Sequence, residues 1–246
     1  MNNNQTVEKL RQMRIGAMAE LHLQHVKNNT MDSCTPDEYL GLLTDHEWES
    51  RQNQKTERLL RQAAFRQKAS VEEVDFSPAR NLDRNMFSRL ATLDFIRRKE
   101  NLIATGASGV GKSYLAQALG HQACLNGLKV FYSNTARLFT RLRLSKTDGT
   151  YLKELKKLQK TNLLILDDFG LHPLDNHCRE ALMDIIDDRY NQASTIIVSQ
   201  IPVSVWYDII GEGTIADAIL DRIVNSSHRI DLKGESMRKG ILKNVN

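Results

Sequence analysis

Residues 106–113 read Gly-Ala-Ser-Gly-Val-Gly-Lys-Ser, which matches the pattern G-x-x-x-x-G-K-[ST] between a strand-like run and a helical pattern. Glycines let the backbone turn its N–H groups toward a phosphate, and the N-terminus of the following helix adds positive potential. Lys112 supplies a charge for the β- and γ-phosphates, and the Ser113 hydroxyl is placed to ligate Mg²⁺. The segment therefore predicts a P-loop for a nucleoside triphosphate. We assign nucleotide contacts to Gly106, Ala107, Ser108, Gly109, Val110, Gly111, Lys112, Ser113 and Tyr114.

From about residue 85 onward, apolar strand-like runs alternate with helical patterns. Strands are expected at residues 101–105, 129–133, 162–167, 195–199 and 228–232, and helices at residues 112–126, 176–191 and 214–225. This alternation is typical of a parallel sheet that is covered by helices on both faces. Ligands of such sheets bind at the carboxyl ends of the strands. We therefore predict an α/β fold whose active edge includes the P-loop.

Two adjacent carboxylates, Asp167 and Asp168, end the expected third strand in the segment LLILDDFG. In P-loop NTPases a second strand ends in an acid that holds Mg²⁺, so we assign Asp167 to the metal together with Ser113. Asp168 can then orient or deprotonate the attacking water. The alternative interpretation of Asp168 is a helix N-cap or turn residue. The acidic pair favours a hydrolase with an in-line catalytic carboxylate.

The first 66 residues contain helical patterns and no strand-like run. Thr35-Pro36-Asp37-Glu38 predicts a helix start, with Thr35 as N-cap and Glu38 completing a capping box. Residues 67–84 have mixed charge and contain Pro78, which suggests a linker. We therefore predict a helical N-terminal domain at 1–66 for assembly or partner binding, a linker at 67–84 and an ATPase domain at 85–246.

Composition excludes several classes of protein. Hydrophobic residues make up 41% and charged residues 26% of the chain, which is ordinary for a globular protein. No apolar run approaches the roughly 18 residues of a membrane span, and the N-terminus lacks the pattern of a secretory signal. The three cysteines have no C-x-x-C spacing, and the seven histidines have no metal-ligand spacing. We therefore expect a cytoplasmic protein with reduced thiols and no contact with a membrane.

Several further segments carry a family resemblance. They are KLRQMRIGAMAE, GVGKSYLAQALGHQACLNGLKVFY, LLILDDFGLHPLD, DDRYNQASTIIVSQIPVSVWYDIIG and IADAILDRIVNSSHRIDLKGESMRK. Over nearly its whole length the chain resembles the IstB-like ATP-binding proteins, the AAA+ helper ATPases of bacterial insertion sequences and close kin of DnaC-type helicase loaders. The resemblance implies an AAA+ fold without a C-terminal helical lid, with ATP and Mg²⁺ as cofactors. It also implies a homo-oligomer on duplex DNA that hydrolyses ATP and assists the transposase of the same element.

The resemblance also implies roles for single residues. Ser199 and Gln200 follow the fourth expected strand, where the family keeps a polar sensor of the γ-phosphate. Arg222 matches an arginine that is presented to the nucleotide of a neighbouring subunit. Arg238 matches an arginine near the phosphates, and Asn101 a position near the base. Strand-end polarity at Ser199 and an intrachain salt bridge at Arg222 are the alternatives.

Two positions depart from the family pattern. Many relatives have glutamate where this chain has Asp168, and the shorter side chain implies a slower or differently placed base. Many relatives also have threonine in place of Ser113, which keeps the hydroxyl.

A basic segment lies between the second and third expected strands. Residues 135–160 contain eight lysines and arginines but only two acids, whereas the net charge of the whole chain is +4. Taken alone, such a run suggests a solvated helical face. The family has a DNA-contacting insertion at this place, so we expect phosphate contacts, which confer affinity but little sequence preference. The candidate DNA-binding residues are Arg137, Arg141, Arg143, Lys146, Lys153, Lys156, Lys157 and Lys160.

Three other functions remain open from the sequence. A replicative helicase loader would use the same ATPase core with a different partner for its N-terminal region. A small-molecule kinase would need a substrate pocket and a mobile lid, of which the sequence shows no sign. A DNA scaffold that binds ATP only as a structural switch would lack turnover.

Overall fold

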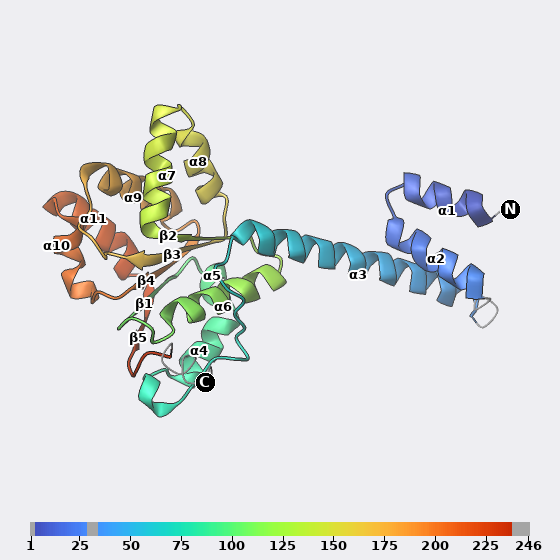
Figure 1. The fold of residues 1–246 in the computed structure, drawn as a ribbon, viewed down its shortest axis with the longest axis horizontal. Helices are drawn as coiled ribbons and strands as arrows, with labels where there is room; N and C mark the ends of the chain where they lie inside the picture. The colour runs from blue at the N-terminus through green and yellow to red at the C-terminus, as the bar shows by residue number, and fades with distance from the viewer. Residues whose placement is uncertain (1–2, 29–33, 238–246) are drawn as a thin grey trace, which may run out of the picture. The chain divides into compact units, whose positions relative to one another are not determined.

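The computed structural model describes residues 3–28 and 34–237, and the chain forms two compact units that divide between Arg58 and Leu59 (Figure 1). Arg238, which the sequence suggested as a phosphate contact, lies outside the described residues. Among the described residues, no helix is long and apolar enough to cross a membrane.

The N-terminal unit contains α1 (Asn3–Gln12), α2 (Gly16–Asn28) and the first part of α3 (Pro36–Ala63). The predicted helix start is confirmed, because the backbone N–H of Thr35 donates to Glu38 at 2.8 Å and the N–H of Glu38 donates to the Thr35 hydroxyl at 3.3 Å. The Thr35 N–H and the Thr35 hydroxyl, the latter at 2.8 Å, both donate to the Glu38 carboxylate and lower its pKa. Glu47 accepts from Met18 N at 3.1 Å and ties α3 to α2.

The second unit is built on a five-stranded parallel sheet in the order β2-β3-β4-β1-β5. The expected strands are all present, within one or two residues of their predicted bounds. They are β1 (Asn101–Gly106), β2 (Val130–Asn134), β3 (Leu163–Phe169), β4 (Ser194–Ser199) and β5 (Ser227–Leu232). The α/β fold predicted from the sequence is therefore confirmed.

Helices cover both faces of this sheet (Figure 1). They are α4 (Arg84–Ala91), α5 (Asp94–Arg97), α6 (Lys112–Leu125), α7 (Thr135–Thr147), α8 (Tyr151–Gln159), α9 (Asn176–Arg189), α10 (Trp206–Ile210) and α11 (Gly213–Val224), with short 3₁₀ turns η2 (Pro78–Arg80) and η3 (Val203–Val205). Leu163 and Ile165 of β3 pack in the core beneath α6, whereas Leu164 and Leu166 pack in the core beneath α7 and α9. Since alternate side chains of a strand face opposite ways, a strand covered on both sides needs a continuous apolar run.

The segment predicted to be a linker is packed onto the rest of the second unit. We call residues 66–81 the strap. The backbone N–H of Arg66 donates to Gln117 of α6 at 2.7 Å, and the N–H of Ser70 donates to the Tyr114 hydroxyl at 3.2 Å. Ala69, Val74 and, just beyond the strap, Leu82 are buried in the core on the α6 side of the sheet. Because these apolar residues are spread along an irregular segment, no period in the sequence revealed their burial.

Candidate nucleotide site

A cavity of about 430 Å³ lies where the strap, the P-loop and the carboxyl ends of β3 and β4 meet. Its lining includes Ser108, Gly109, Gly111, Lys112, Ser113 and Tyr114 of the predicted nucleotide-binding residues. Gln67, Glu73, Asp75 and Arg80 of the strap line it from the other side. The cavity has a volume typical of small-ligand sites.

The P-loop has the backbone conformation that its glycines allow. Gly109 has a φ of +82° and Gly111 a φ of +94°, backbone angles that residues other than glycine rarely adopt. Lys112 is 5% exposed, and its ammonium donates to the carbonyl of Ala107 at 2.7 Å across the loop. The Lys112 ammonium therefore places a positive charge at the N-terminus of α6. The helix dipole is also positive at this end, so both favour binding of an anion.

Asp167 is a buried carboxylate whose oxygens are satisfied by three donors. It is 1% exposed and accepts from the Ser113 hydroxyl at 2.9 Å, the Tyr132 hydroxyl at 2.7 Å and the N–H of Asp168 at 2.9 Å. Burial, together with the hydrogen bond to Asp167, raises the pKa of Tyr132, so this hydroxyl stays protonated and acts as the donor. These contacts explain how a carboxylate is tolerated at the end of a core strand.

The donor set at Ser113 and Asp167 fits magnesium. A hydroxyl and a carboxylate lie side by side, and oxygen ligands of this kind suit Mg²⁺. Across residues 3–28 and 34–237, no group of three or more histidines, cysteines, aspartates or glutamates is gathered to hold a metal ion. Ser113 and Asp167 are thus suited to a magnesium ion that takes its other ligands from phosphate and water.

Asp168 is in an unusual backbone conformation and faces the cavity. Its φ is +58°, in the left-handed region, and the pairing of β3 with β4 is irregular between Leu166 and Phe169. Its carboxylate accepts from the side-chain amide of Asn134 at 2.9 Å, and it lines the cavity. Aspartate tolerates this conformation better than most residues, and such backbone strain occurs preferentially at functional sites.

The two candidate sensor residues differ in position. Gln200 lines the cavity. Ser199 is completely buried, and its hydroxyl donates to the carbonyl of Phe169 at 2.8 Å and accepts from the N–H of Ile201 at 3.0 Å. The structure thus brings Gln200 but not Ser199 to the nucleotide site, because the Ser199 hydroxyl joins the end of β4 to the end of β3.

Asn101 does not lie in this cavity. It begins β1, whereas the P-loop follows the other end of that strand, about 17 Å away for a strand of this length. The Asn101 side chain accepts from Thr195 N at 2.9 Å and donates to the carbonyl of Arg222 at 3.4 Å. The side-chain amide therefore bridges backbone groups at the amino edge of the sheet, outside the cavity.

Arg222 lies at the same amino edge, opposite its own P-loop. Its Nε atom lies 2.9 Å from Asp187, its Nη1 donates to Ala218 O at 2.9 Å, and its guanidinium lies 5.8 Å from the ring centroid of Tyr190. The intrachain salt bridge considered from the sequence is thus present, with Asp187 as partner. Because Arg222 lies far from the P-loop of its own chain, any contact with a nucleotide has to be made in a second subunit.

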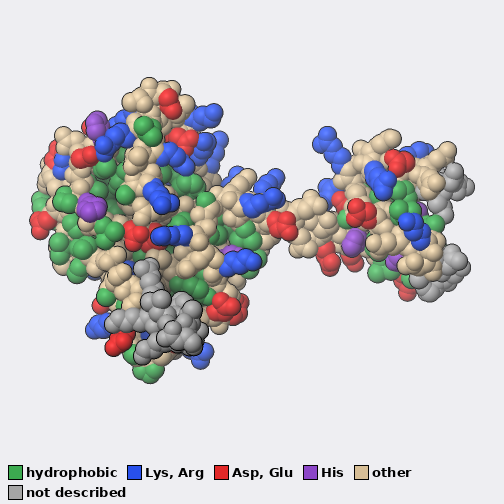
Figure 2. Space-filling model, in the orientation of Figure 1, with side chains coloured by type: hydrophobic (Ala, Val, Ile, Leu, Met, Phe, Trp, Pro, Cys, Tyr) green, Lys and Arg blue, Asp and Glu red, His purple; other side chains and the backbone are tan. Residues whose placement is uncertain are grey.

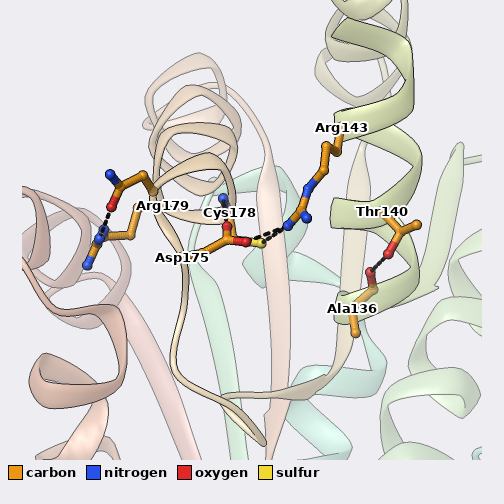
Figure 3. A network of polar contacts seen from close by, with 7 residues as sticks. Ala136, Thr140, Arg143, Asp175, Cys178 and Arg179 are labelled. Carbon is orange, nitrogen blue, oxygen red and sulfur yellow. Dashed lines mark hydrogen bonds and ion pairs between the residues drawn. The ribbon is translucent and has the colours of Figure 1, made fainter. Parts of the chain in front are cut away.

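The eight candidate DNA-binding residues divide into two groups. Four form ion pairs within the chain: Arg141 and Lys157 with Glu154, Arg143 with Asp175, and Lys146 with Glu180. Figure 3 shows Arg143 of α7 pointing toward Asp175 and Cys178. Its Nη2 lies 2.5 Å from the Asp175 carboxylate and 3.7 Å from the Cys178 sulfur. The other four have no ion-pair partner among the described residues: Arg137, Lys153, Lys156 and Lys160.

Lysines gather on the surface of α8. Figure 2 shows Lys and Arg side chains clustered over α7 and α8 on the face in view. A shallow depression there is lined by Leu152, which is 70% exposed, and by Lys153, Lys156, Lys157 and Lys160. We call these five residues the lysine groove.

Residues of the site that were not found from the sequence include Tyr132, Asn134 and the strap residues that line the cavity, Arg80 among them. Asn134 directly follows an expected strand, so the rule that drew attention to Asp168 would also have found it. Tyr132 lies inside the same expected strand, and nothing in the sequence around it distinguishes it from the other residues of that strand. Arg80 was hidden because its segment was interpreted as a linker.

Known proteins similar to this chain include insertion-sequence proteins. The family model described as IstB-like ATP binding protein matches residues 8–244. An insertion sequence ATP-binding protein of Sinorhizobium fredii is 46% identical over 95% of this chain and 96% of its own. The ATP-binding protein of insertion sequence IS1162 from Pseudomonas fluorescens is 40% identical over 83% of this chain and 89% of its own.

Among solved structures, the DnaC helicase loader superposes with a TM-score of 0.52 at 25% identity, covering 65% of this chain and 95% of the loader. The DnaI structure superposes with a TM-score of 0.57 at 24% identity, over 68% of this chain and 92% of DnaI. These similarities agree with a P-loop sheet of the AAA+ type.

Proposed function

The chain belongs to the family of IstB-like ATP-binding proteins, and on that premise we propose that it is an ATPase that assembles on duplex DNA and assists the transposase of its insertion sequence. The observation that carries the proposal is the division of the chemistry between two edges of one sheet. The P-loop, Asp167 and Asp168 line or adjoin one cavity, whereas Arg222 lies at the opposite edge.

The hydrolytic part of the proposal rests on the cavity. Lys112 and the N–H groups of the loop bind the phosphates, with magnesium held by Ser113 and Asp167 to offset their charge. Asp168 orients the attacking water and accepts its proton, while Asn134 holds the carboxylate in place. Gln200 lies in the same cavity and is the remaining candidate for a contact with the γ-phosphate or the water.

Assembly is the second part of the proposal. Arg222 is suited to complete the site of a neighbouring subunit, because its Nε is held by Asp187 while Nη2 has no hydrogen-bond partner among the described residues. An arginine in this role stabilises the charge that develops on the transferred phosphoryl group. ATP turnover then requires a neighbour, so hydrolysis occurs only in the oligomer.

The lysine groove and Arg137 are the proposed DNA contacts. Lys153 and Lys156 of α8 and Lys160 at its C-cap are spaced three and four residues apart, so they lie on one face. Their ammonium groups have no intrachain ion pair, among the described residues, to break before they contact phosphates. Contacts of this kind give affinity that depends strongly on salt and weakly on base sequence.

A helicase loader is the second candidate function, favoured by the similarity to the DnaC structure. The two functions share the ATPase unit and differ in the partner of the N-terminal unit. Co-purification with the transposase of the same element supports the first function. Co-purification with a replicative helicase instead would support the second.

The decisive experiment measures ATP hydrolysis as a function of protein concentration, with and without duplex DNA. We expect phosphate release to rise more steeply than linearly with concentration and to be stimulated by DNA. A rate that is linear in protein and indifferent to DNA would contradict assembly-dependent turnover. Transfer of phosphate to a small molecule, without release of inorganic phosphate, would indicate a kinase.

A further inference from the structure

Arg80 is a buried cation beside the P-loop. It is 7% exposed and ends the short turn η2 in the strap. Its Nη2 donates to the carbonyl of Val110 in the P-loop, and its nearest carboxylate oxygen belongs to Asp75, at 3.6 Å. Its Nε is buried and has no hydrogen-bond partner in the described part of the chain. A guanidinium is costly to bury with incomplete pairing, so its position next to this loop calls for a function.

The contact between Arg80 and the carbonyl of Val110 sets the direction of the Gly111 N–H, a donor placed to bind an anion. The carbonyl of Val110 and the N–H of Gly111 belong to one planar trans peptide, so they point in opposite directions. By holding the carbonyl on its own side, Arg80 turns the Gly111 N–H to the other side of the loop. Gly111 is the N-cap of α6, where N–H groups bind phosphate.

Arg80 and Gly111 also fit each other sterically. A Cβ at position 111 would lie 2.6 Å from Arg80 Nη2, closer than any real contact of this kind. The φ of +94° at Gly111 separately disfavours a side chain there. The guanidinium thus occupies the space that the missing side chain leaves open.

The backbone of Arg80 is anchored, so its side chain approaches the loop from a fixed point. Its carbonyl accepts from the N–H of Lys233 at 3.1 Å, just beyond β5. The neighbouring Asn81 donates through its side chain to the carbonyl of Asp231 at 3.0 Å. The strap is therefore held against the end of β5 on one side of the P-loop.

We infer that Arg80 is a positioning residue for polyphosphate binding: through the carbonyl of Val110 it holds the Gly111 N–H in the orientation that receives a phosphate. The inference rests on the ATP binding of the proposed function and adds a residue from outside the motif. It assigns Arg80 a part in the affinity for the phosphate chain and none in recognition of the base.

The test compares binding of ATP and of inorganic tripolyphosphate to Arg80→Ala by calorimetry. We expect both affinities to fall by the same factor, about tenfold, as for loss of one charge-assisted hydrogen bond. Arg84→Ala is the matched control, because Arg84 is an exposed arginine four residues away that stacks on Phe76 at 5.0 Å. Wild-type affinities in Arg80→Ala would overturn the inference, as would a loss for ATP with none for tripolyphosphate, which would indicate a contact with the nucleoside.

A second variant keeps the inference testable if Arg80→Ala does not fold. Arg80→Lys keeps the charge but lacks the planar fork that reaches Val110, so we expect a several-fold loss for both ligands. Unchanged binding of tripolyphosphate by a folded Arg80→Lys would overturn the inference. Failure of the wild-type protein to bind ATP would instead contradict the proposed function, so the two failures are distinguishable.

Discussion

The side-chain amide group of Asn134 donates through its nitrogen to the carboxylate of Asp168 at 2.9 Å. The side-chain oxygen Oδ1 of Asn134 accepts from the backbone N–H of Arg137 at 3.3 Å. One side chain therefore joins the proposed catalytic carboxylate to the first turn of α7, which carries part of the basic segment. A displacement of α7 on DNA would be transmitted directly to Asp168.

Asn134→Asp tests this connection. Aspartate keeps the helix cap but replaces the donor with a second carboxylate that repels Asp168, so we expect some loss of stability together with loss of DNA-stimulated turnover. Asn134→Ala should lose the stimulation too and also about 1 kcal/mol of stability, because the cap is removed. The readout is the ratio of ATPase rates with and without duplex DNA. A wild-type ratio in both variants would contradict the connection.

Asp168→Asn should bind ATP normally but hydrolyse it at least about a hundredfold more slowly, the contribution expected of a general base. Binding is measured by calorimetry and turnover by phosphate release. Asp217→Asn is the control, because Asp217 is an exposed carboxylate of α11 that does not line the cavity. Equal rates in wild type and Asp168→Asn would show that another group activates the water.

Lys112→Ala and Arg222→Ala should each be inactive alone and active when mixed. The first should fail to bind ATP, and the second should lose about 10³-fold or more in turnover. In the mixture, subunits with an intact P-loop meet neighbours with an intact Arg222, so phosphate release returns. A mixture that stays inactive, or a fully active Arg222→Ala, would rule out action between subunits.

Asp187→Asn extends the same test, because Asp187 holds the Nε of Arg222 at 2.9 Å. In a mixture with Arg222→Ala subunits, the double variant Lys112→Ala/Asp187→Asn should restore less phosphate release than Lys112→Ala does, because its Arg222 is no longer held in place. The neighbouring Asp188→Asn is the control, since no ion pair joins Asp188 to Arg222 among the described residues.

Replacing Lys153, Lys156 and Lys160 with alanine should weaken DNA binding and make it less sensitive to salt. The slope of log affinity against log salt concentration should decrease by about 0.9 for each DNA phosphate that the variant no longer neutralises. Lys146→Ala should change the slope less, because its ammonium is already paired with Glu180 at 2.8 Å. Equal slopes in the triple variant and the wild type would remove the lysine groove from the DNA surface.

Tyr132→Phe should destabilise the protein by about 1–3 kcal/mol at neutral pH, because Asp167 is deprived of a donor in a buried site. The pKa of Tyr132 is raised, so its contribution is fully present below the ordinary tyrosine pKa near 10 and is lost as the pH rises above it. Denaturant unfolding between pH 7 and pH 11 measures both effects.

Tyr151→Phe is the control for that series. Burial and a hydrogen bond to Asp184 also raise the pKa of Tyr151, but this residue lies on α8 away from the nucleotide cavity. The stability that the Tyr151 hydroxyl contributes should likewise be lost as the pH rises above the ordinary tyrosine pKa of about 10. The Tyr151→Phe variant should keep wild-type ATPase activity. If Tyr132→Phe were as stable as wild type at neutral pH, the hydrogen bond to Asp167 would contribute little.

Patterns that are local in the sequence were predicted correctly. The apolar run at 163–166 needs cover on both faces wherever it lies, and it forms the buried first part of β3. The Thr35–Glu38 capping box closes within a single turn. The glycines and lysine of the P-loop form one contiguous motif, which runs from the end of β1 to the start of α6.

Contacts between distant segments appeared only in the folded chain. Ser199 and Gln200 are adjacent in the sequence. Pairing of β4 with β3 nevertheless buries the Ser199 hydroxyl and leaves the Gln200 side chain in the cavity. Asn101 and the P-loop belong to opposite ends of β1, which sequence proximity conceals. Four of the eight basic residues are paired with acids on α8, on α9 and at the N-cap of α9.

Local sequence thus determined the elements, the phosphate loop and the acidic pair, because periodicity and motif act over a few neighbouring residues. Tertiary structure decided which side chains share the cavity and which charges remain unpaired. It alone brought Arg80 of the strap to the carbonyl of Val110, thirty residues away. The physical reason is that such contacts depend on how elements pack, and packing brings together residues whose separation in sequence carries no signal.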